Sequence, residues 1–473
     1  MSVTGEINPL IGFMEAKSVV IVGASKRKDS PGNIVAYNFV RSDFEGDVYF
    51  VNPKGGKLFS KNVYPSILDI PEVVDLAIVI TPARFVPRSI EECAVRGIKR
   101  VVIASGGFSE AGSEGKKLQD RIDEIAREHS IRIIGPNCVG ILNPPMKLDT
   151  LFLPDSKVKR PEFGVMSFFS QSGAFGVSFL NEIAFIGYGR WISKFISYGN
   201  ATDINECDII EYLGQDESTK VILGYIEGFK DARGFLETAR EVSREKPIIL
   251  MKSNRNPVGA RASASHTASI ATNDSVTDNL LRASGILRVA DWVELFNVAQ
   301  AFATQPLPRG RKVAVITNAG GLAVMASDAL GDHGLKLAKL SPGTLAELRE
   351  LLPPMAIIDN PIDLTASSTN DQFRKVLETV RKDPGVDVIL MMPLPSAPEI
   401  VVDDFITMMY GLNEEKTLGS EKPFLFVSMG GEDAELIKSR LQRINVPTYS
   451  LPEHAAKAIS ELCTFSETKD IQP

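Results

Sequence analysis

His266 is the first candidate for chemistry, because it lies in a run of small residues, GARASASHTASIATND, at 259–274. Such a loop has little bulk to bury an imidazole ring, so packing alone is a poor reason for a histidine here. The other histidines, His129, His333 and His454, are scattered and form no HxxxH or HExxH spacing. The sequence therefore predicts no metal site. An ordinary surface histidine and a histidine that itself receives a chemical group both remain open.

Glu227 is the carboxylate that could act with His266. It follows the apolar run VILGYI, and a second apolar run, PIILMKS, lies between Glu227 and His266. Parallel strands end at one edge of a sheet, so the two side chains could meet in one crevice. A carboxylate on one imidazole nitrogen fixes the tautomer and leaves the other nitrogen free as a nucleophile or general base. The alternative for Glu227 is a surface carboxylate at a strand end.

A second candidate is the stretch SFFSQSGAFG, in which a strand is expected to end at Ser170 and a helix to begin around Ser172 and Gly173. Backbone N–H groups at such a helix start form an anion site. The stretch does not match the GxSxG nucleophile elbow. Ser172 could equally be a plain N-cap residue.

A third candidate is VVIVGASKRKDSPGN, a strand and a Gly-Ala-Ser turn before a helix expected near Gly32. Its backbone donors and Lys26 could bind a phosphate. The turn departs from GxGxxG, and VNPKGG places Lys54 where an NAD site has an acidic residue, so an NAD dehydrogenase is disfavoured. A structural turn with solvated lysines remains the alternative.

The elements that must position these residues are apolar runs alternating with helix-like segments. The apolar runs end in Gly, Pro, Ser or Asn, and they are SVVIVGAS, DVYFVNPKGG, VDLAIVITPAR, KRVVIASGGFSE and IRIIGPNCVGI. The helix-like segments between them include FVPRSIEECAVRG and GKKLQDRIDEIAREH. This alternation predicts an α/β fold with parallel, doubly wound sheets and ligand crevices at the carboxyl ends of the strands. The stretch NPPMKLDTLFLPDSKVKRPEFG and the linker TQPLPRGRK then divide the chain into three domains, 1–150, 151–307 and 308–473.

Composition excludes several function classes. The 473 residues are 44% hydrophobic and 23% charged, which is typical of a globular protein. A net charge of −7 disfavours a nucleic-acid partner. The four cysteines form no CxxC pair, and no segment resembles a secretion signal or a membrane span of roughly 18 apolar residues. We expect a cytoplasmic protein without a disulfide framework.

A series of short motifs resembles, in order along the chain, the α subunit of ADP-forming acetyl-CoA synthetases. The motifs are VGAS, VNPKGG, ITPA, SGGFSE, IGPNCVGI, SQSGAF, IEG, ASHTASIA and VITNAGG. These belong to the NDP-forming acyl-CoA synthetase superfamily, which includes succinyl-CoA synthetase. The resemblance covers nearly the whole chain. It implies an N-terminal Rossmann-like CoA-binding domain followed by two flavodoxin-like domains of the succinyl-CoA synthetase type, the third with a structural or interface role.

The resemblance also implies roles for individual residues. His266 would carry a phosphoryl group, Glu227 would steady the phosphohistidine, and Ser172 and Gly173 would bind the phosphate. The implied CoA-binding residues are Gly23, Ala24, Ser25, Lys26, Val51, Asn52, Pro53, Lys54, Thr81, Pro82, Ser105 and Gly106, with Asn137 and Cys138 near the reactive thioester end.

The implied activity converts acyl-CoA, phosphate and ADP reversibly into a carboxylic acid, CoA and ATP, through an acyl phosphate and a phosphohistidine. The sequence contains no GxxxxGK[ST] loop and no ATP-grasp-like region. The resemblance therefore implies a separate ATP-grasp β subunit, an α₂β₂ assembly, and Mg²⁺ bound with ADP. A non-catalytic or regulatory CoA-binding protein is the alternative.

Overall fold

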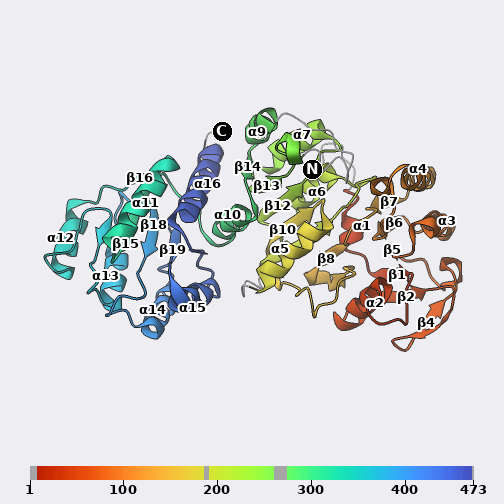
Figure 1. The fold of residues 1–473 in the computed structure, drawn as a ribbon, viewed down its shortest axis with the longest axis horizontal. Coiled ribbons are helices and arrows are strands. Elements are labelled where there is room, and N and C mark those ends of the chain that lie inside the picture. Colours follow the sequence, from red (N-terminus) through yellow and green to blue (C-terminus); the bar gives the residue numbers. More distant parts are fainter. Residues whose placement is uncertain (1–7, 186–190, 260–273, 471–473) are drawn as a thin grey trace. The chain divides into compact units, whose positions relative to one another are not determined.

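The computed structural model describes residues 8–185, 191–259 and 274–470. In these residues it forms three mainly parallel sheets flanked by helices (Figure 1). The predicted α/β architecture is confirmed. The chain divides into two compact units, the first ending at Ala290 and the second beginning at Asp291. None of the described helices is both long enough and apolar enough to cross a membrane.

The first sheet has the strand order β3-β4-β2-β1-β5-β6-β7 and is parallel except for the β3–β4 hairpin. Its strands are β1 (Ser18–Val22), β2 (Asp47–Val51), β3 (Gly56–Leu58), β4 (Lys61–Tyr64), β5 (Leu76–Val79), β6 (Arg100–Ile103) and β7 (Arg132–Ile134). Its helices are α1 (Ile11–Met14), α2 (Pro31–Arg41), α3 (Val86–Arg96) and α4 (Ser113–Glu128), with short 3₁₀ helices at Ile67–Asp69, Ala83–Phe85 and Ser109–Ala111. Strand order reverses between β2 and β5 on either side of β1, which is where ligands bind in such sheets.

The second sheet has the order β14-β13-β12-β10-β11-β8-β9. Its strands are β8 (Ile141–Asn143), β9 (Leu148–Asp149), β10 (Phe163–Ser170), β11 (Ile192–Ser197), β12 (Val221–Ile226), β13 (Ile248–Lys252) and β14 (Ile286–Val289). Its helices are α5 (Gly173–Phe185), α6 (Glu206–Gln215), α7 (Ala232–Val242) and α9 (Asp274–Ala283), and a 3₁₀ helix spans Pro144–Met146. The hairpin β8–β9 pairs antiparallel with β11, although it precedes residue 150.

The first two sheets belong to one compact unit and share a core. Buried side chains of β1, such as Ile21, cluster with Phe169 of β10 and Ile196 of β11. The carboxyl ends of strands from both sheets can therefore contribute to one site. The domain limits at residues 150 and 307 stay predictions.

The second unit contains a sheet of order β16-β15-β18-β19-β20, with β17 paired to β15. Its strands are β15 (Lys312–Thr317), β16 (Lys336–Leu337), β17 (Ile362–Asp363), β18 (Val388–Met392), β19 (Phe424–Val427) and β20 (Thr448–Tyr449). Its helices are α10 (Trp292–Thr304), α11 (Gly320–Asp332), α12 (Pro342–Leu351), α13 (Asn370–Val380), α14 (Val402–Glu414), α15 (Gly431–Gln442) and α16 (Pro452–Asp470).

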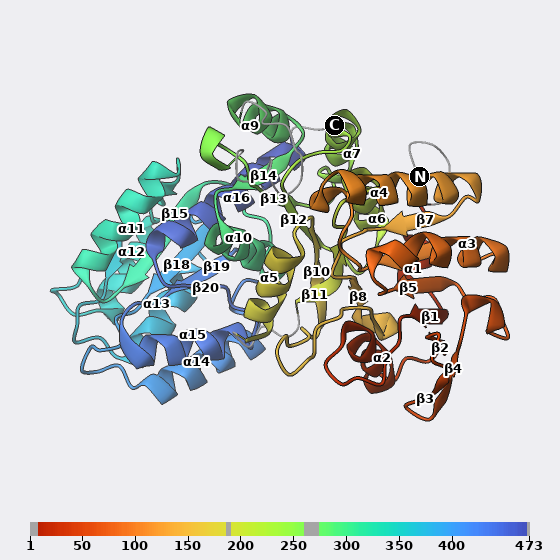
Figure 2. The same ribbon diagram turned by 45° about the vertical axis from the view of Figure 1, so that its right-hand side comes forward.

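Both faces of this sheet are buried, because successive side chains of a strand point to opposite faces. Ile316 packs with residues of α12 to α15, whereas Val315 packs with residues of α10, α11 and α16. Figure 2 shows α14 and α15 side by side in this unit. The strands β15, β18 and β19 are accordingly almost wholly apolar and buried, as expected of parallel strands covered on both sides.

Candidate active site

A cavity of about 340 Å³ lies where strands of the first two sheets end. Glu227 follows β12, Ser172 and Gly173 follow β10, and Asn137 and Cys138 follow β7, and all five line this cavity. The structure thus brings together residues that are far apart in the sequence. His266 lies in 260–273, outside the described residues.

The Glu227 backbone is fixed by side chains from both neighbouring strand ends. Gln171 Oε1 accepts hydrogen bonds from Glu227 N at 2.8 Å and from Gly228 N at 3.1 Å. The Glu227 carbonyl accepts from Asn254 Nδ2 at 3.0 Å and from Lys252 Nζ at 3.3 Å. This places the carboxylate on a rigid support, which a group that orients an imidazole requires. Sequence reasoning missed Gln171, although it stands next to Ser172.

Helix α5 begins at Gly173 beside the cavity. Ser172 Oγ accepts from Phe175 N at 3.3 Å, as an N-cap side chain does, and Ser170 Oγ donates to the Ser172 carbonyl at 2.6 Å. A Cβ atom on Gly173 would lie 2.4 Å from Val139 Cγ2, so this position requires glycine. The helix start offers backbone N–H groups and a positive dipole end to an anion.

Asn137 and Cys138 both line the cavity but differ in exposure. Asn137 is exposed and has a left-handed backbone (φ 58°), which asparagine tolerates better than most residues. Cys138 is buried, and its Sγ donates to the Ile103 carbonyl at 3.3 Å. Burial raises the pKa of the Cys138 thiol to about 12, so it is protonated near neutral pH and unsuited to nucleophilic attack.

A groove of about 900 Å³ runs along the carboxyl ends of β1, β2 and β5. The predicted CoA residues that line it are Gly23, Ser25, Val51, Asn52, Pro53, Lys54, Thr81 and Pro82. An adjoining cavity of about 300 Å³ adds Ala24 and Lys26 to this set. Their position at the strand-order reversal is where a doubly wound sheet binds nucleotides.

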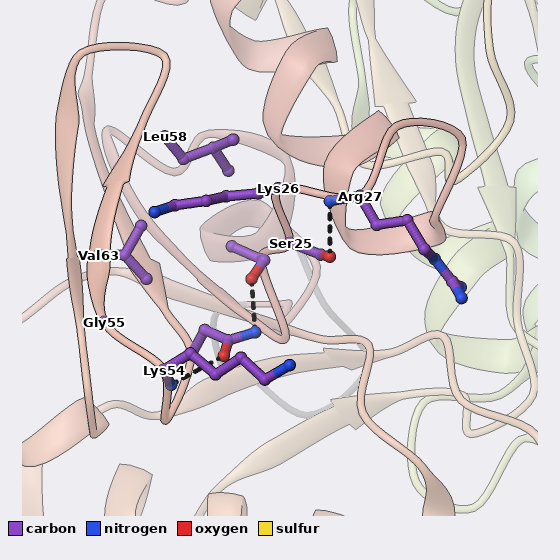
Figure 3. Close-up of a pocket in the computed structure, with 9 residues that line it drawn as sticks. Ser25, Lys26, Arg27, Lys54, Gly55, Leu58 and Val63 are labelled. Carbon is purple, nitrogen blue, oxygen red and sulfur yellow. Dashed lines mark hydrogen bonds between the residues drawn. The ribbon is translucent and has the colours of Figure 1, made fainter.

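Hydrogen bonds hold the two loops of this groove together. Asn52 Nδ2 donates to the Ala24 carbonyl at 2.8 Å, and Lys54 N donates to Asn52 Oδ1 at 3.0 Å. Figure 3 shows the Lys26 side chain running toward Leu58 and Val63, with the Lys54 side chain running the other way. The loops thereby carry two ammonium groups on a fixed backbone, an arrangement that suits a chain of phosphates.

Ser105 and Gly106 lie at the end of β6, beside both regions. Ser105 Oγ donates to the Thr81 carbonyl at 2.5 Å, and the Ser105 carbonyl accepts from Asn137 N at 2.9 Å. A Cβ on Gly106 would lie 3.1 Å from Asn137 Oδ1. Neither residue lines the groove or the 340 Å³ cavity, but Ser105 forms hydrogen bonds with a lining residue of each.

Three further polar residues were missed in the sequence. Glu110 and Asn200 line the 340 Å³ cavity, and Arg88 of α3 lines the large groove. Burial tends to raise the pKa of Glu110, but hydrogen bonds from Asn200, Gly107 and Phe108 outweigh it and lower the pKa overall. Glu110 is therefore an ionised carboxylate. It is the last residue of SGGFSE, a motif that indicated a strand end and the family resemblance but no role for this carboxylate.

Known protein families match each of the three sheets. A CoA binding domain matches residues 17–144, a succinyl-CoA ligase like flavodoxin domain matches 163–302, and a Ligase-CoA domain matches 313–459. In the part of the chain that the structure describes, no group of three or more His, Cys, Asp and Glu side chains is arranged to hold a metal ion.

Similar proteins cover almost the whole chain. The α subunit of acetate–CoA ligase [ADP-forming] II of Pyrococcus furiosus is 37% identical over 94% of this chain and 95% of its own length. Acetate–CoA ligase [ADP-forming] of Methanocaldococcus jannaschii is 38% identical over 96% of this chain, which spans 63% of that protein. The solved structure of Ca. Korarchaeum cryptofilum dinucleotide forming acetyl-coenzyme A synthetase 1, in complex with phosphate and ADP, is 30% identical, covers 98% of both chains and has a TM-score of 0.92. The chain therefore belongs to the family of ADP-forming acetate–CoA ligases, among their α subunits.

Proposed function

We propose that this chain is the α subunit of an ADP-forming acyl-CoA synthetase with acetate as its expected acid. The reaction converts acyl-CoA, phosphate and ADP into the acid, CoA and ATP, and it is reversible. The observation that carries the proposal is the 340 Å³ cavity, in which Glu227 and the Ser172–Gly173 turn lie beside Asn137 and next to the large groove of the first sheet.

The chemistry proceeds in three transfers. A phosphate oxygen attacks the thioester carbon, the C–S bond breaks, and acyl phosphate and the CoA thiolate form. A ring nitrogen of His266 then attacks phosphorus and releases the carboxylate. The phosphohistidine finally passes its phosphoryl group to ADP. The first turn of α5 would stabilise the phosphoryl oxygens, and Glu227 would orient the imidazole.

CoA would bind along the groove, with Lys26 and Lys54 near its phosphates and its thiol end reaching Asn137. The roles of the remaining predicted CoA residues follow from the same path. Their position along β1, β2 and β5 supports this assignment, because the groove lies at the strand-order reversal of the sheet. Cys138 would contribute to packing beneath the thioester end, since its thiol is buried.

The nucleotide would be bound by a partner, an ATP-grasp β subunit in an α₂β₂ assembly, with Mg²⁺ entering alongside ADP. The absence of a GxxxxGK[ST] loop supports this arrangement, as does the greater length of the Methanocaldococcus relative, of which this chain spans 63%. We retain 1–150, 151–307 and 308–473 as the proposed domains, with a structural or interface role for the third.

The test is phosphorylation of the chain, mixed with its β partner, by γ-labelled ATP and Mg²⁺. We expect an acid-labile, base-stable label that His266→Ala abolishes and that the control His129→Ala, at an exposed histidine, leaves unchanged. A label that persists in His266→Ala would move the carrier to another residue. A wild-type chain that binds CoA but takes up no label would instead be a regulatory CoA-binding protein.

A further inference from the structure

Glu110 lies between the cavity and a set of side-chain amides. Its Oε1 accepts from Gly107 N at 2.6 Å and Phe108 N at 3.1 Å, and its Oε2 accepts from Asn200 Nδ2 at 2.6 Å. An ionised carboxylate can only accept hydrogen bonds. The amide group of Asn200 must therefore turn its NH₂ toward Glu110.

A second acceptor reinforces this orientation. Asn200 Nδ2 also lies 3.1 Å from Gln119 Oε1, which itself accepts from Ser109 N at 3.3 Å. With its NH₂ held on this side, Asn200 presents Oδ1 on the other side, toward Asn137. The orientation of Asn200 is thus decided by the groups around it.

Asn137 extends this chain of hydrogen bonds, which begins at Glu110 and passes through Asn200, to the cavity. Its Nδ2 donates to Asn200 Oδ1 at 3.3 Å, so its own Oδ1 is turned away from Asn200. Among the described residues, no donor forms a hydrogen bond with Asn137 Oδ1, and the side chain is exposed and lines the cavity. The side-chain oxygen Oδ1 of Asn137 is therefore an acceptor available to a bound molecule.

We propose that Glu110 is a positioning residue. Through Asn200 it keeps the side-chain oxygen Oδ1 of Asn137 toward the cavity, where this oxygen accepts a hydrogen bond from an N–H group of the substrate. This inference rests on the proposed function, in which the arm of CoA ends here. A carbonyl oxygen repels phosphate oxygens, which are also acceptors, and selects a donor. The amide N–H nearest the thiol of CoA is such a donor.

Glu110→Gln tests the relay because the change is nearly isosteric. The new Oε1 can still accept from Gly107 and Phe108, which leaves Nε2 facing the NH₂ of Asn200. Two donors then oppose each other. Turning Asn200 removes this contact but brings its Oδ1 beside Gln119 Oε1, so Gln119 turns with it, and Asn137 turns as well. We expect the KM for CoA to rise about 3- to 10-fold, the loss of one neutral hydrogen bond, with kcat and the KM for phosphate within twofold of wild type.

Two further measurements separate positioning from a structural effect. In Asn137→Asp both side-chain oxygens are acceptors, so one can accept from the turned Asn200 while the other still accepts from CoA. The double variant Glu110→Gln/Asn137→Asp should therefore have a lower KM for CoA than Glu110→Gln alone. A CoA analogue can carry an ester oxygen in place of the amide N–H nearest the thiol. Wild type should bind this analogue about 5-fold more weakly than it binds CoA, whereas Glu110→Gln should bind the analogue and CoA equally well. Glu114→Gln, at an exposed carboxylate of α4, is the control.

These experiments use the chain with its β partner for kinetics and the chain with CoA for calorimetry. An unchanged KM for CoA in Glu110→Gln, equal discrimination against the ester analogue by both proteins, or a double variant worse than Glu110→Gln would each overturn the inference. A wild-type enzyme without acyl-CoA synthetase activity would overturn the proposed function instead, so the two failures are distinguishable.

Discussion

Gly173→Ala is the most direct perturbation of the proposed phosphate site. The added Cβ would lie 2.4 Å from Val139 Cγ2, more than 1 Å inside an ordinary carbon–carbon contact of about 3.5–4.0 Å. Val139 is buried (7% exposed), so relief requires the start of α5 to shift. Overpacking of this kind costs about 1–3 kcal/mol, and the helix preference of alanine returns up to about 1 kcal/mol. We expect a net destabilisation of about 0.5–2 kcal/mol.

The functional effect should be larger than the loss of stability. A shift of about 1 Å at a site that positions a reacting group can lower the rate about 100-fold. We therefore expect Gly173→Ala to lower kcat/KM for phosphate by about 10- to 100-fold in acyl-CoA phosphorolysis. The KM for CoA should change little, because the CoA groove lies on the first sheet. Urea unfolding measured alongside the kinetics separates the two effects.

A compensating variant makes the reasoning refutable. Val139→Ala removes Cγ2, and the remaining Cβ of residue 139 would lie 3.7 Å from the new Cβ, an ordinary contact. Gly173→Ala/Val139→Ala should thus recover phosphate turnover relative to Gly173→Ala. Gly321→Ala is the stability control, because among the described residues its Cβ would meet no atom within 4 Å. Wild-type phosphate kinetics in Gly173→Ala, or no recovery in the double variant, would refute the steric argument.

Three other predictions follow from the same geometry. Gln171→Leu removes the acceptor for Glu227 N and Gly228 N, so we expect the free energy of unfolding to fall by about 2 kcal/mol and kcat to fall at least 10-fold. Gln171→Glu keeps an acceptor and should retain most of the acyl-CoA phosphorolysis activity. Burial raises the pKa of Glu206, and backbone N–H donors only partly offset this effect. The folded chain therefore binds the Glu206 proton more tightly than the unfolded chain does. The stability that this proton contributes is complete below the unfolded pKa and is lost as pH rises through the folded pKa. Glu206→Gln should therefore be more stable than wild type at pH 8, by about 1 kcal/mol, with the difference shrinking toward pH 4 in urea titrations; a constant difference would contradict this. Cys138 should resist alkylation at pH 7.5 in the folded chain, as measured by mass spectrometry, and Cys138→Ala should keep kcat within about 3-fold; rapid labelling would show the thiol to be exposed.

The sequence by itself determined the elements and the ends at which ligands bind. Apolar runs ending in Gly, Pro, Ser or Asn predicted parallel strands. In the structure β10 ends at the predicted Ser170, and β1 and β12 end at Val22 and Ile226, directly before Gly23 and Glu227. Such signals are local: the period of apolar residues and the turn chemistry are both contained in a few consecutive positions. The predicted position of Ser172 at a helix start is of the same kind.

Tertiary structure alone decided which of these ends share a cavity and which side chains face it. Glu110 and Asn200 are 90 residues apart, and they meet because the first two sheets pack through one core. The neighbours Asn137 and Cys138 both line the cavity, but the first is exposed and the second is buried, a difference that no local pattern predicts. Hydrogen-bond donors and acceptors are paired across space, so their orientation depends on the packing of distant segments and not on the order of residues along the chain.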